Sequence, residues 1–469
     1  MKMFNKSAIS AGILTALVTL SSSVNALEKP QTMDDMWKII QAQQKQIDEM
    51  KSERVAATTA PMSNKSAAEV QNLEHKTNVL TQEVEKLRTN LAIPEEKALK
   101  SAYGLGPAAS KVYQVGKGLS IGGYGEANYQ AIVNDETPQK NGDSANLHNN
   151  ADFERLVMYM GYKFTDNILF NSEIEFEHGS TDKGGTVSVE MAALDFFIDP
   201  MFNVRAGMVL LPMGFINTIH EPPFYFGNNR PETERRIIPS TWRDVGVGIF
   251  GELLPNLTYT AYGVSGLDAA GFDSNGIRSG RQQGAQARAE DLAFVGKLEY
   301  APDFLTGVSF GGSAYLGNSG QNQTYAGQRA DAFTQLYEGH IQVKYRGVEF
   351  RTLGSYGHID DADVLSQAKK QTVGSSNYGW YTEIGYDVLP LFTATSQYLA
   401  PFFRYEHLDT IATAPDGYID NDNKNQQIYQ VGLQYKPIPN VVIKADYRNF
   451  TAKQGTVPDD FNLGFGFIF

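Results

Sequence analysis

The sequence contains no cysteine and is short of positive charge. With no Cys among 469 residues, disulfide bonds, thiolate metal sites and a cysteine nucleophile are excluded. The 40 Lys and Arg residues are outnumbered by 53 Asp and Glu residues, for a net charge of -13. Nucleic acid is bound by basic surfaces, so we expect no nucleic-acid partner.

Long apolar runs are also absent after the first segment. Residues 1–26 begin with Lys2 and Lys6, continue through an apolar stretch at 8–20 and end in Val24-Asn25-Ala26. This pattern is typical of a cleaved signal peptide, and the apolar stretch is too short for a membrane helix. Removing it leaves a net charge of -15, because it contains two lysines and no acid. A β-barrel could still span a membrane, because only alternate strand residues face lipid.

Residues 27–94 differ from the rest in having almost no aromatic side chains. A heptad pattern of apolar residues is clearest in its second half, with spacings of three and four. We predict a periplasmic coiled coil over 27–94 with a hinge near 55–68, followed by a linker over 95–117. An amphipathic helix lying on a barrel would show a similar face, but seven consecutive seam positions favour the coiled coil. The predicted oligomerisation seam consists of Val70, Leu73, Leu80, Val84, Leu87 and Leu91.

From residue 118 onward the apolar period changes to two, which indicates strands with one apolar and one polar face. Within 168–178, for example, Ile174 and Phe176 alternate with Glu173, Glu175 and Glu177. The strands predicted from this pattern are 119–133, 151–164, 168–178, 186–198, 202–211, 245–253, 257–266, 291–301, 307–317, 333–345, 348–358, 377–388, 399–409, 426–436, 440–453 and 460–469.

The connections between these strands alternate in length. Tight turns fall at 165–167, 199–200, 254–256 and 346–347, and longer polar loops mostly lie between them. Bacterial outer-membrane barrels have short periplasmic turns, long outer loops and an even number of strands. We therefore predict an all-β transmembrane antiparallel barrel of about 16 strands over 118–469.

The last strand has the strongest alternation. Phe461, Leu463, Phe465, Phe467 and Phe469 are separated by small or polar residues. An exposed aromatic edge at a free terminus would invite aggregation unless it closed a barrel. This strand resembles the C-terminal signature of bacterial outer-membrane proteins.

Two catalytic sequence motifs occur in the chain, but neither has the structural context that the motif requires. Residues 246–251 spell GxGxxG and residues 307–311 spell GxSxG, but both need a helix directly after the motif. Each lies instead within an alternating strand, so we expect no cofactor and no enzyme. A barrel-embedded hydrolase with Ser309 as nucleophile stays open as an alternative.

No set of residues has the spacing of a metal site. The closest approaches are His220-Glu221 and Glu406-His407, and scattered histidines are more often surface or lumen residues. The acidic loop residues at 360–363 and 416–422 lack the glycine and glutamate of a calcium loop. We expect no metal site, apart from loose divalent binding near lipopolysaccharide.

The longest barrel loop, 212–244, is rich in aromatic residues, prolines and charge. Its composition argues against disorder, and a loop of this length is usually functional. We predict that it folds inward and narrows the lumen, with a surface cap as the alternative. The arginines could pair with lumen acids such as Glu173 and Glu175, or some could remain unpaired and attract anions. The predicted constriction residues are Glu221, Arg230, Glu232, Glu234, Arg235, Arg236 and Arg243.

The strand pattern places many charges on the inner wall. A charge facing lipid would cost about 2–4 kcal/mol at mid-membrane for Arg or Lys, so the polar face must be the lumen. A dry lumen would not hold so many charges, which predicts a water-filled channel. The predicted lumen-wall residues are Arg155, Glu173, Glu175, Glu177, Arg205, Arg351, Arg404, Lys444 and Arg448.

Four stretches, 104–113, 119–126, 220–223 and 238–243, resemble the phosphate-selective porin O and P family, as does the C-terminal strand. The N-terminal coiled coil is similar to that of the DcaP-like porins. The resemblance implies a trimer of sixteen-stranded barrels whose third outer loop lines the constriction. Phosphate porins line their path with basic residues, whereas Glu173, Glu175 and Glu177 share one face here, so no phosphate ligand is carried over.

We therefore predict a porin for passive diffusion of small hydrophilic solutes, anions among them. It would lie in the outer membrane of a Gram-negative bacterium as a homotrimer, in contact with lipid and lipopolysaccharide, with its N-terminal region in the periplasm. Besides the hydrolase, a second alternative is a barrel that anchors the periplasmic coiled coil.

Overall fold

The computed structural model describes residues 99–133, 148–179, 184–420 and 422–469. The predicted signal peptide and the predicted coiled coil, with its hinge and its seam from Val70 to Leu91, lie outside the described residues. Within the described part of the chain, no helix is both long enough and apolar enough to cross a membrane.

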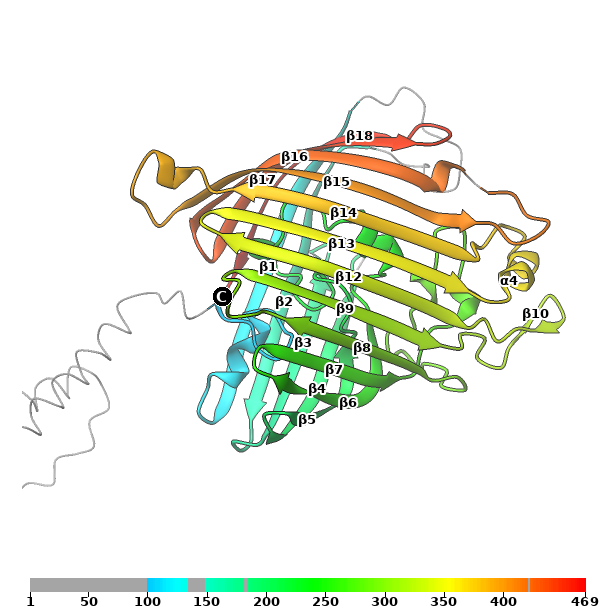
Figure 1. The fold of residues 1–469 in the computed structure, drawn as a ribbon, viewed down its shortest axis with the longest axis horizontal. Coiled ribbons are helices and arrows are strands. Elements are labelled where there is room, and N and C mark those ends of the chain that lie inside the picture. The colour runs from blue at the N-terminus through cyan, green and yellow to red at the C-terminus, as the bar shows by residue number, and fades with distance from the viewer. Residues whose placement is uncertain (1–98, 134–147, 180–183, 421) are drawn as a thin grey trace, which may run out of the picture. The chain divides into compact units, whose positions relative to one another are not determined.

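Sixteen strands of the described residues close into one antiparallel barrel in which β1 pairs with β18 (Figure 1). The barrel strands are β1 Gly118–Val133, β2 Asn150–Lys163, β3 Ile168–Glu177, β4 Val187–Asp199, β5 Phe202–Leu210, β6 Arg243–Leu254, β7 Leu257–Val264, β8 Ala293–Tyr300, β9 Val308–Gly317, β12 Thr334–Tyr345, β13 Val348–Ile359, β14 Ser376–Tyr386, β15 Tyr398–Thr413, β16 Asn425–Ile438, β17 Val441–Ala452 and β18 Asp459–Ile468.

The prediction of a sixteen-stranded antiparallel barrel is confirmed, and most predicted strand ends lie within two residues of the observed ends. Short turns such as 200–201 and 346–347 alternate with long connections such as 211–242 and 265–292, also as predicted. The sequence did not predict the small elements inside the long connections, which are the β10–β11 hairpin, Thr324–Tyr325 with Gln328–Arg329, and helix α4, Ala362–Lys369.

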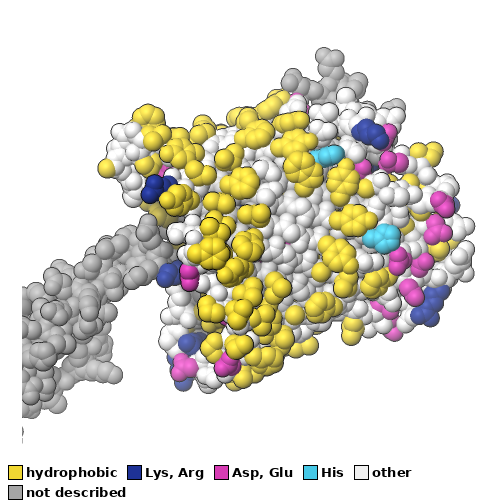
Figure 2. All heavy atoms as spheres, viewed as in Figure 1, with side chains coloured by type: hydrophobic (Ala, Val, Ile, Leu, Met, Phe, Trp, Pro, Cys, Tyr) yellow, Lys and Arg dark blue, Asp and Glu magenta, His cyan; other side chains and the backbone are white. Residues whose placement is uncertain are grey.

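Alternation along each strand separates an apolar outer face from a polar inner face. In β18, Phe461 is 41% exposed and Leu463 is 48% exposed, whereas Asn462 between them is fully buried. Figure 2 shows hydrophobic side chains spread over the strands facing the viewer, with charged side chains gathered towards the two ends of the barrel. This distribution suits a barrel surrounded by lipid.

The C-terminal residue completes the ring. The backbone N–H of Phe469 donates to the carbonyl of Gly123 at 2.9 Å, and the N–H of Gly123 donates to the carbonyl of Phe469 at 3.0 Å. A Cβ at Gly123 would lie 2.7 Å from the Phe469 ring, so only glycine admits this close approach.

Residues 99–117, which the sequence assigns to a linker, pack against the barrel wall. Leu105, Ala109 and Val112 are at most 4% exposed, and Val112 lies so close to Gly161 on β2 that a Cβ there would be 2.4 Å away. The 3₁₀ helix η2, Ala109–Tyr113, is held by Asn171, whose Nδ2 donates to the Ala109 carbonyl at 2.8 Å. The described part of this segment is therefore a component of the barrel.

Candidate functional site inside the barrel

The connection between β5 and β6, residues 211–242, crosses the barrel interior. Lys297 on β8 donates to the carbonyl of Gly214 at 3.0 Å, and Lys444 on β17 donates to the carbonyl of Gly227 at 2.8 Å. These two strands are seven positions apart in the ring of sixteen, which is almost opposite. The segment, called the inner loop below, therefore spans the lumen from wall to wall.

Two inner-wall arginines hold the middle of the inner loop through its backbone. Arg351 on β13 donates to the carbonyl of Phe224 at 2.6 Å, and Arg404 on β15 donates to the carbonyl of Phe226 at 2.7 Å. Glu383 on β14 accepts from both arginines, at 3.4 and 2.9 Å. Charged hydrogen bonds of this kind are about twice as strong as neutral ones, so they fix the loop's position.

Glu232 forms ion pairs with two arginines of the inner loop and with one arginine of the wall. Its Oε2 accepts from Arg235 at 2.7 Å and from Arg236 at 2.8 Å, and its Oε1 lies 3.3 Å from Arg448 on β17. Although burial opposes ionisation, these three guanidinium groups hold the pKa of Glu232 well below its usual range. The two loop arginines are thus neutralised locally.

Glu234 is the opposite case, because it is fully buried and forms no ion pair with a lysine or arginine of the described residues. Its carboxylate accepts from the backbone N–H groups of Phe215 and Ile216, at 2.9 and 2.7 Å, and from the Tyr381 hydroxyl at 2.6 Å. Burial raises the pKa of Glu234 to about 7, and the nearby Glu338 adds to the effect.

Glu221 and Arg230 complete the predicted loop residues. Glu221 accepts from the backbone N–H groups of Ala108 and Ala109, at 2.9 and 3.4 Å, and so joins the inner loop to the segment before β1. Arg230 has two buried guanidinium nitrogens, Nε and Nη2, without a hydrogen-bond partner among the described residues. Arg243 has one such nitrogen, Nε, but its Nη1 is paired with Glu190.

The predicted wall residues lie on the inner face, and most of them pair with side chains of neighbouring strands or of the inner loop. Arg155 on β2 contacts Glu126 on β1 at 2.9 Å and Glu175 on β3 at 3.1 Å. Arg205 on β5 contacts Asp195 on β4 at 2.6 Å. The remaining pairs are Arg448 with Asp460, and Glu177 with the hydroxyl of Thr186.

The expected partners of the loop arginines were wrong. Arg243 is the first residue of β6 rather than part of the loop, and it contacts Glu190 at 2.7 Å. Glu175 is taken by Arg155, and Glu173 by His220. Most of the wall charges are buried in ion pairs that offset the loss of hydration, so their number alone does not require a water-filled lumen, contrary to the prediction.

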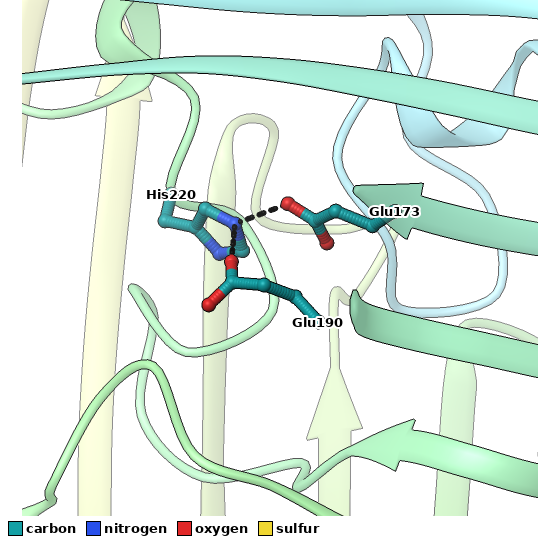
Figure 3. A group of neighbouring side chains, drawn as sticks. All are labelled: Glu173, Glu190 and His220. Atoms are coloured by element: carbon teal, nitrogen blue, oxygen red, sulfur yellow. Dashed lines mark hydrogen bonds and ion pairs between the residues drawn. The ribbon is translucent and has the colours of Figure 1, made fainter. Parts of the chain in front are cut away.

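One group of side chains was missed by the sequence analysis. His220 of the inner loop lies against Glu173 on β3 and Glu190 on β4, with its Nε2 at 2.9 Å from Glu173 Oε1 and 3.7 Å from Glu190 Oε2 (Figure 3). All three side chains are at most 1% exposed. They form a cluster that joins the loop to the wall, called the His220 cluster below.

A break in strand alternation explains why Glu190 was missed. In the β3–β4 pairing the register shifts between Glu173 and Ile174, so Glu190 has no partner and points inward together with Met191. The outward residues Val189 and Leu194 are five positions apart, whereas unbroken alternation requires an even spacing. That odd spacing of apolar residues was the signal available in the sequence.

A cavity remains between the inner loop and the wall near β1, β2, β17 and β18. It is lined by polar side chains from the wall and the loop, together with Pro222, Phe465 and Gly466, and the polar ones are Glu126, Asn128, Glu154, Asn228 and Lys444. Carboxylates and an ammonium group therefore face the same space, which suits water and small polar solutes better than apolar ligands.

Solved structures similar to this chain are outer-membrane proteins. The outer-membrane channel DcaP of Acinetobacter baumannii is 14% identical, with 75% of this chain and 97% of that chain covered and a TM-score of 0.48. The anion-selective porin of Comamonas acidovorans is 10% identical, with 75% and 99% covered and a TM-score of 0.46. A loop L8 deletion mutant of OmpT of Vibrio cholerae is 10% identical, with 76% and 100% covered and a TM-score of 0.49.

Sequence comparison gives a closer relative. No protein-family model matches the sequence, so the resemblance to the phosphate-selective porin O and P family stays a prediction. A protein of Aquifex aeolicus (strain VF5), described as uncharacterized, is 37% identical over 386 residues, which cover 77% of this chain and 82% of that protein. The chain therefore belongs to the same protein family as this Aquifex aeolicus protein.

Proposed function

We propose that the protein is an outer-membrane porin through which small hydrophilic solutes, anions among them, diffuse passively. The observation that carries the proposal is the combination of an apolar outer surface with an inner wall and an inner loop that are both charged. Lipid would surround the outer face, with lipopolysaccharide around the long loops. The inner loop would then form the constriction of the channel.

Ion pairing within the constriction supports weak charge selectivity. Arg235 and Arg236 share Glu232, and Arg243 is paired with Glu190, so these arginines contribute little net field. Arg230 differs because two of its guanidinium nitrogens have no hydrogen-bond partner in the part of the chain that the structure describes. We infer that Arg230 supplies a modest preference for anions.

Single-channel recording of the full chain in planar bilayers tests this proposal. Arg230→Gln should shift the reversal potential in a salt gradient towards cations, whereas Arg235→Gln, which removes a paired charge, should shift it less. A variant with Arg230, Arg235, Arg236 and Arg243 all changed to Ala should change both conductance and ion preference. As a control, exposed loop arginines such as Arg288 and Arg329 changed to Ala should leave both unchanged.

An unchanged conductance and an unchanged ion preference in the four-arginine variant would show that the inner loop does not limit the channel. A folded wild-type barrel that conducts no ions would favour the alternative in which the barrel anchors a periplasmic coiled coil. The hydrolase alternative is not favoured, because Ser309 lies within β9 rather than on a turn into a helix.

A further inference from the structure

We propose that Glu173, Glu190 and His220 bind one divalent first-row transition metal ion inside the barrel. The inference goes beyond the channel proposal and does not depend on it, because metal binding is measured without any solute flux. The metal would pin the inner loop to strands β3 and β4.

The geometry of the His220 cluster is convergent. One ligand atom from each of the three residues lies within 4.8 Å of the others, and the two carboxylates face the same ring nitrogen (Figure 3). Metal–ligand bonds to imidazole nitrogen and carboxylate oxygen are about 2.0–2.2 Å long, so an ion between these atoms needs only small side-chain adjustments.

Each carboxylate is held by one oxygen and leaves the other without a hydrogen-bond partner. Glu190 Oε1 accepts from Thr241 at 2.8 Å and from Arg243 at 2.7 Å, and Glu173 Oε1 accepts from Tyr159 at 3.1 Å. Glu173 Oε2 and Glu190 Oε2 are buried with no hydrogen-bond partner among the described residues. Buried, unpartnered acceptors are costly, and a bound cation would satisfy them.

The fold contributes to this convergence. The bulge in β4 turns Glu190 inward beside Met191, at the point where Glu173 of β3 is adjacent. Without the bulge, alternation would direct only one of the two neighbours Glu190 and Met191 inward. Bulges that redirect a side chain are typical of functional sites, so this one supports a site built for a ligand.

The ligand set selects the class of ion. Imidazole nitrogen favours zinc, iron, nickel and copper, while a pair of carboxylates is also acceptable to manganese. Two carboxylates and one neutral imidazole would neutralise a divalent ion. Three protein ligands leave further positions for water or an added donor.

The rival state is a protonated His220 bound by the two carboxylates without metal. The chain offers a matched comparison in His340, which also contacts two carboxylates, Glu299 at 2.7 Å and Glu338. There each ring nitrogen contacts a different carboxylate, so the ligand atoms do not converge on one point. His340 therefore represents an ion-pair network without a metal site.

The test measures zinc bound to the detergent-purified full chain after chelator treatment and dialysis. Wild type should take up one Zn²⁺ per chain more than His220→Gln, and His340→Gln should match wild type. Loss of an outer-shell partner alone weakens metal binding about 10–100-fold, so loss of His220 should weaken it more than that. Glu190→Gln should show a similar loss.

X-ray absorption at the zinc edge of the wild-type protein keeps the test independent of whether variants fold. One imidazole nitrogen and carboxylate oxygens in the first shell would support the site. Zinc uptake equal in wild type and folded His220→Gln, or a spectrum without an imidazole ligand, would overturn it and leave the protonated His220 as the structural link.

Discussion

At the scale of single residues, Glu234 links the inner loop to pH. Its pKa of about 7 in the folded protein lies above its ordinary value of 4.5, because the carboxyl group is buried. A raised pKa means that the folded state keeps a proton that the unfolded chain has lost. Its stabilising contribution is therefore complete below about pH 4.5 and is lost as pH rises through 7.

We predict that Glu234→Gln flattens this part of the pH dependence. Between pH 4.5 and 7 the wild-type free energy of unfolding should fall relative to that of the variant, by on the order of 3 kcal/mol. Denaturant unfolding of both proteins in detergent at several pH values measures the difference. Glu232→Gln is the control, because the pKa of Glu232 is lowered from its ordinary value of 4.5. The stabilising effect of its ionised form is complete above pH 4.5 and is lost only below it, so between pH 4.5 and 7 this variant should run parallel to wild type. A difference between wild type and Glu234→Gln that stays constant with pH would contradict the prediction.

At the scale of secondary-structure elements, the inner loop should be docked permanently on β14. A Cβ added at Gly379 would lie 3.2 Å from Thr233 Oγ1, which is close to the Cβ–sulfur separation in a disulfide. We predict that Thr233→Cys with Gly379→Cys forms a disulfide in a chain that otherwise has no cysteine. Oxidised and reduced forms should have the same conductance.

Gel mobility and mass of the oxidised protein measure the cross-link. Thr233→Cys with Gly385→Cys is the matched control, since six strand residues separate the two glycines by about 20 Å. A control that cross-links as readily as the test pair would mean that the loop moves widely. A conductance that depends on oxidation would mean that it opens during transport.

The sequence predicted the elements well because an apolar outer face and a polar inner face impose an alternation that can be followed residue by residue. Leu463 and Asn462 are a clear example in β18. The site was harder to predict, because His220 lies in a loop without periodicity. Its partner Glu190 lies at a bulge in β4, where the alternation of inward and outward residues is broken. Pairings such as Arg243 with Glu190 depend on which strands are neighbours around the ring, and alternation alone does not reveal the partner.

At the scale of the whole molecule, the heptad seam predicts that chains associate, and the resemblance to porins predicts that there are three of them. The number three comes from the resemblance to trimeric porins, whereas the need for partner helices comes from Val70, Leu80 and the other seam residues. We predict that the detergent-solubilised full chain has the mass of three copies. Leu80→Ser with Leu87→Ser should lower the temperature at which the trimer dissociates.

Gln82→Ser with Thr89→Ser changes positions on the opposite side of the same heptads and should leave that temperature unchanged. Light scattering with correction for bound detergent gives the mass. A monomer, or equal effects of the two double variants, would contradict a seam that joins the chains.

The pairing of β1 with β18, which includes the bonds between Phe469 and Gly123, also determines when the barrel can close. β1 finds its second partner only when β18 is present, so a chain that has not yet reached β18 has two open strand edges. Open backbone edges are not tolerated within the hydrocarbon region of a membrane. In a membrane, the barrel could therefore close only after β18 had been added, and any earlier intermediate would need both edges covered.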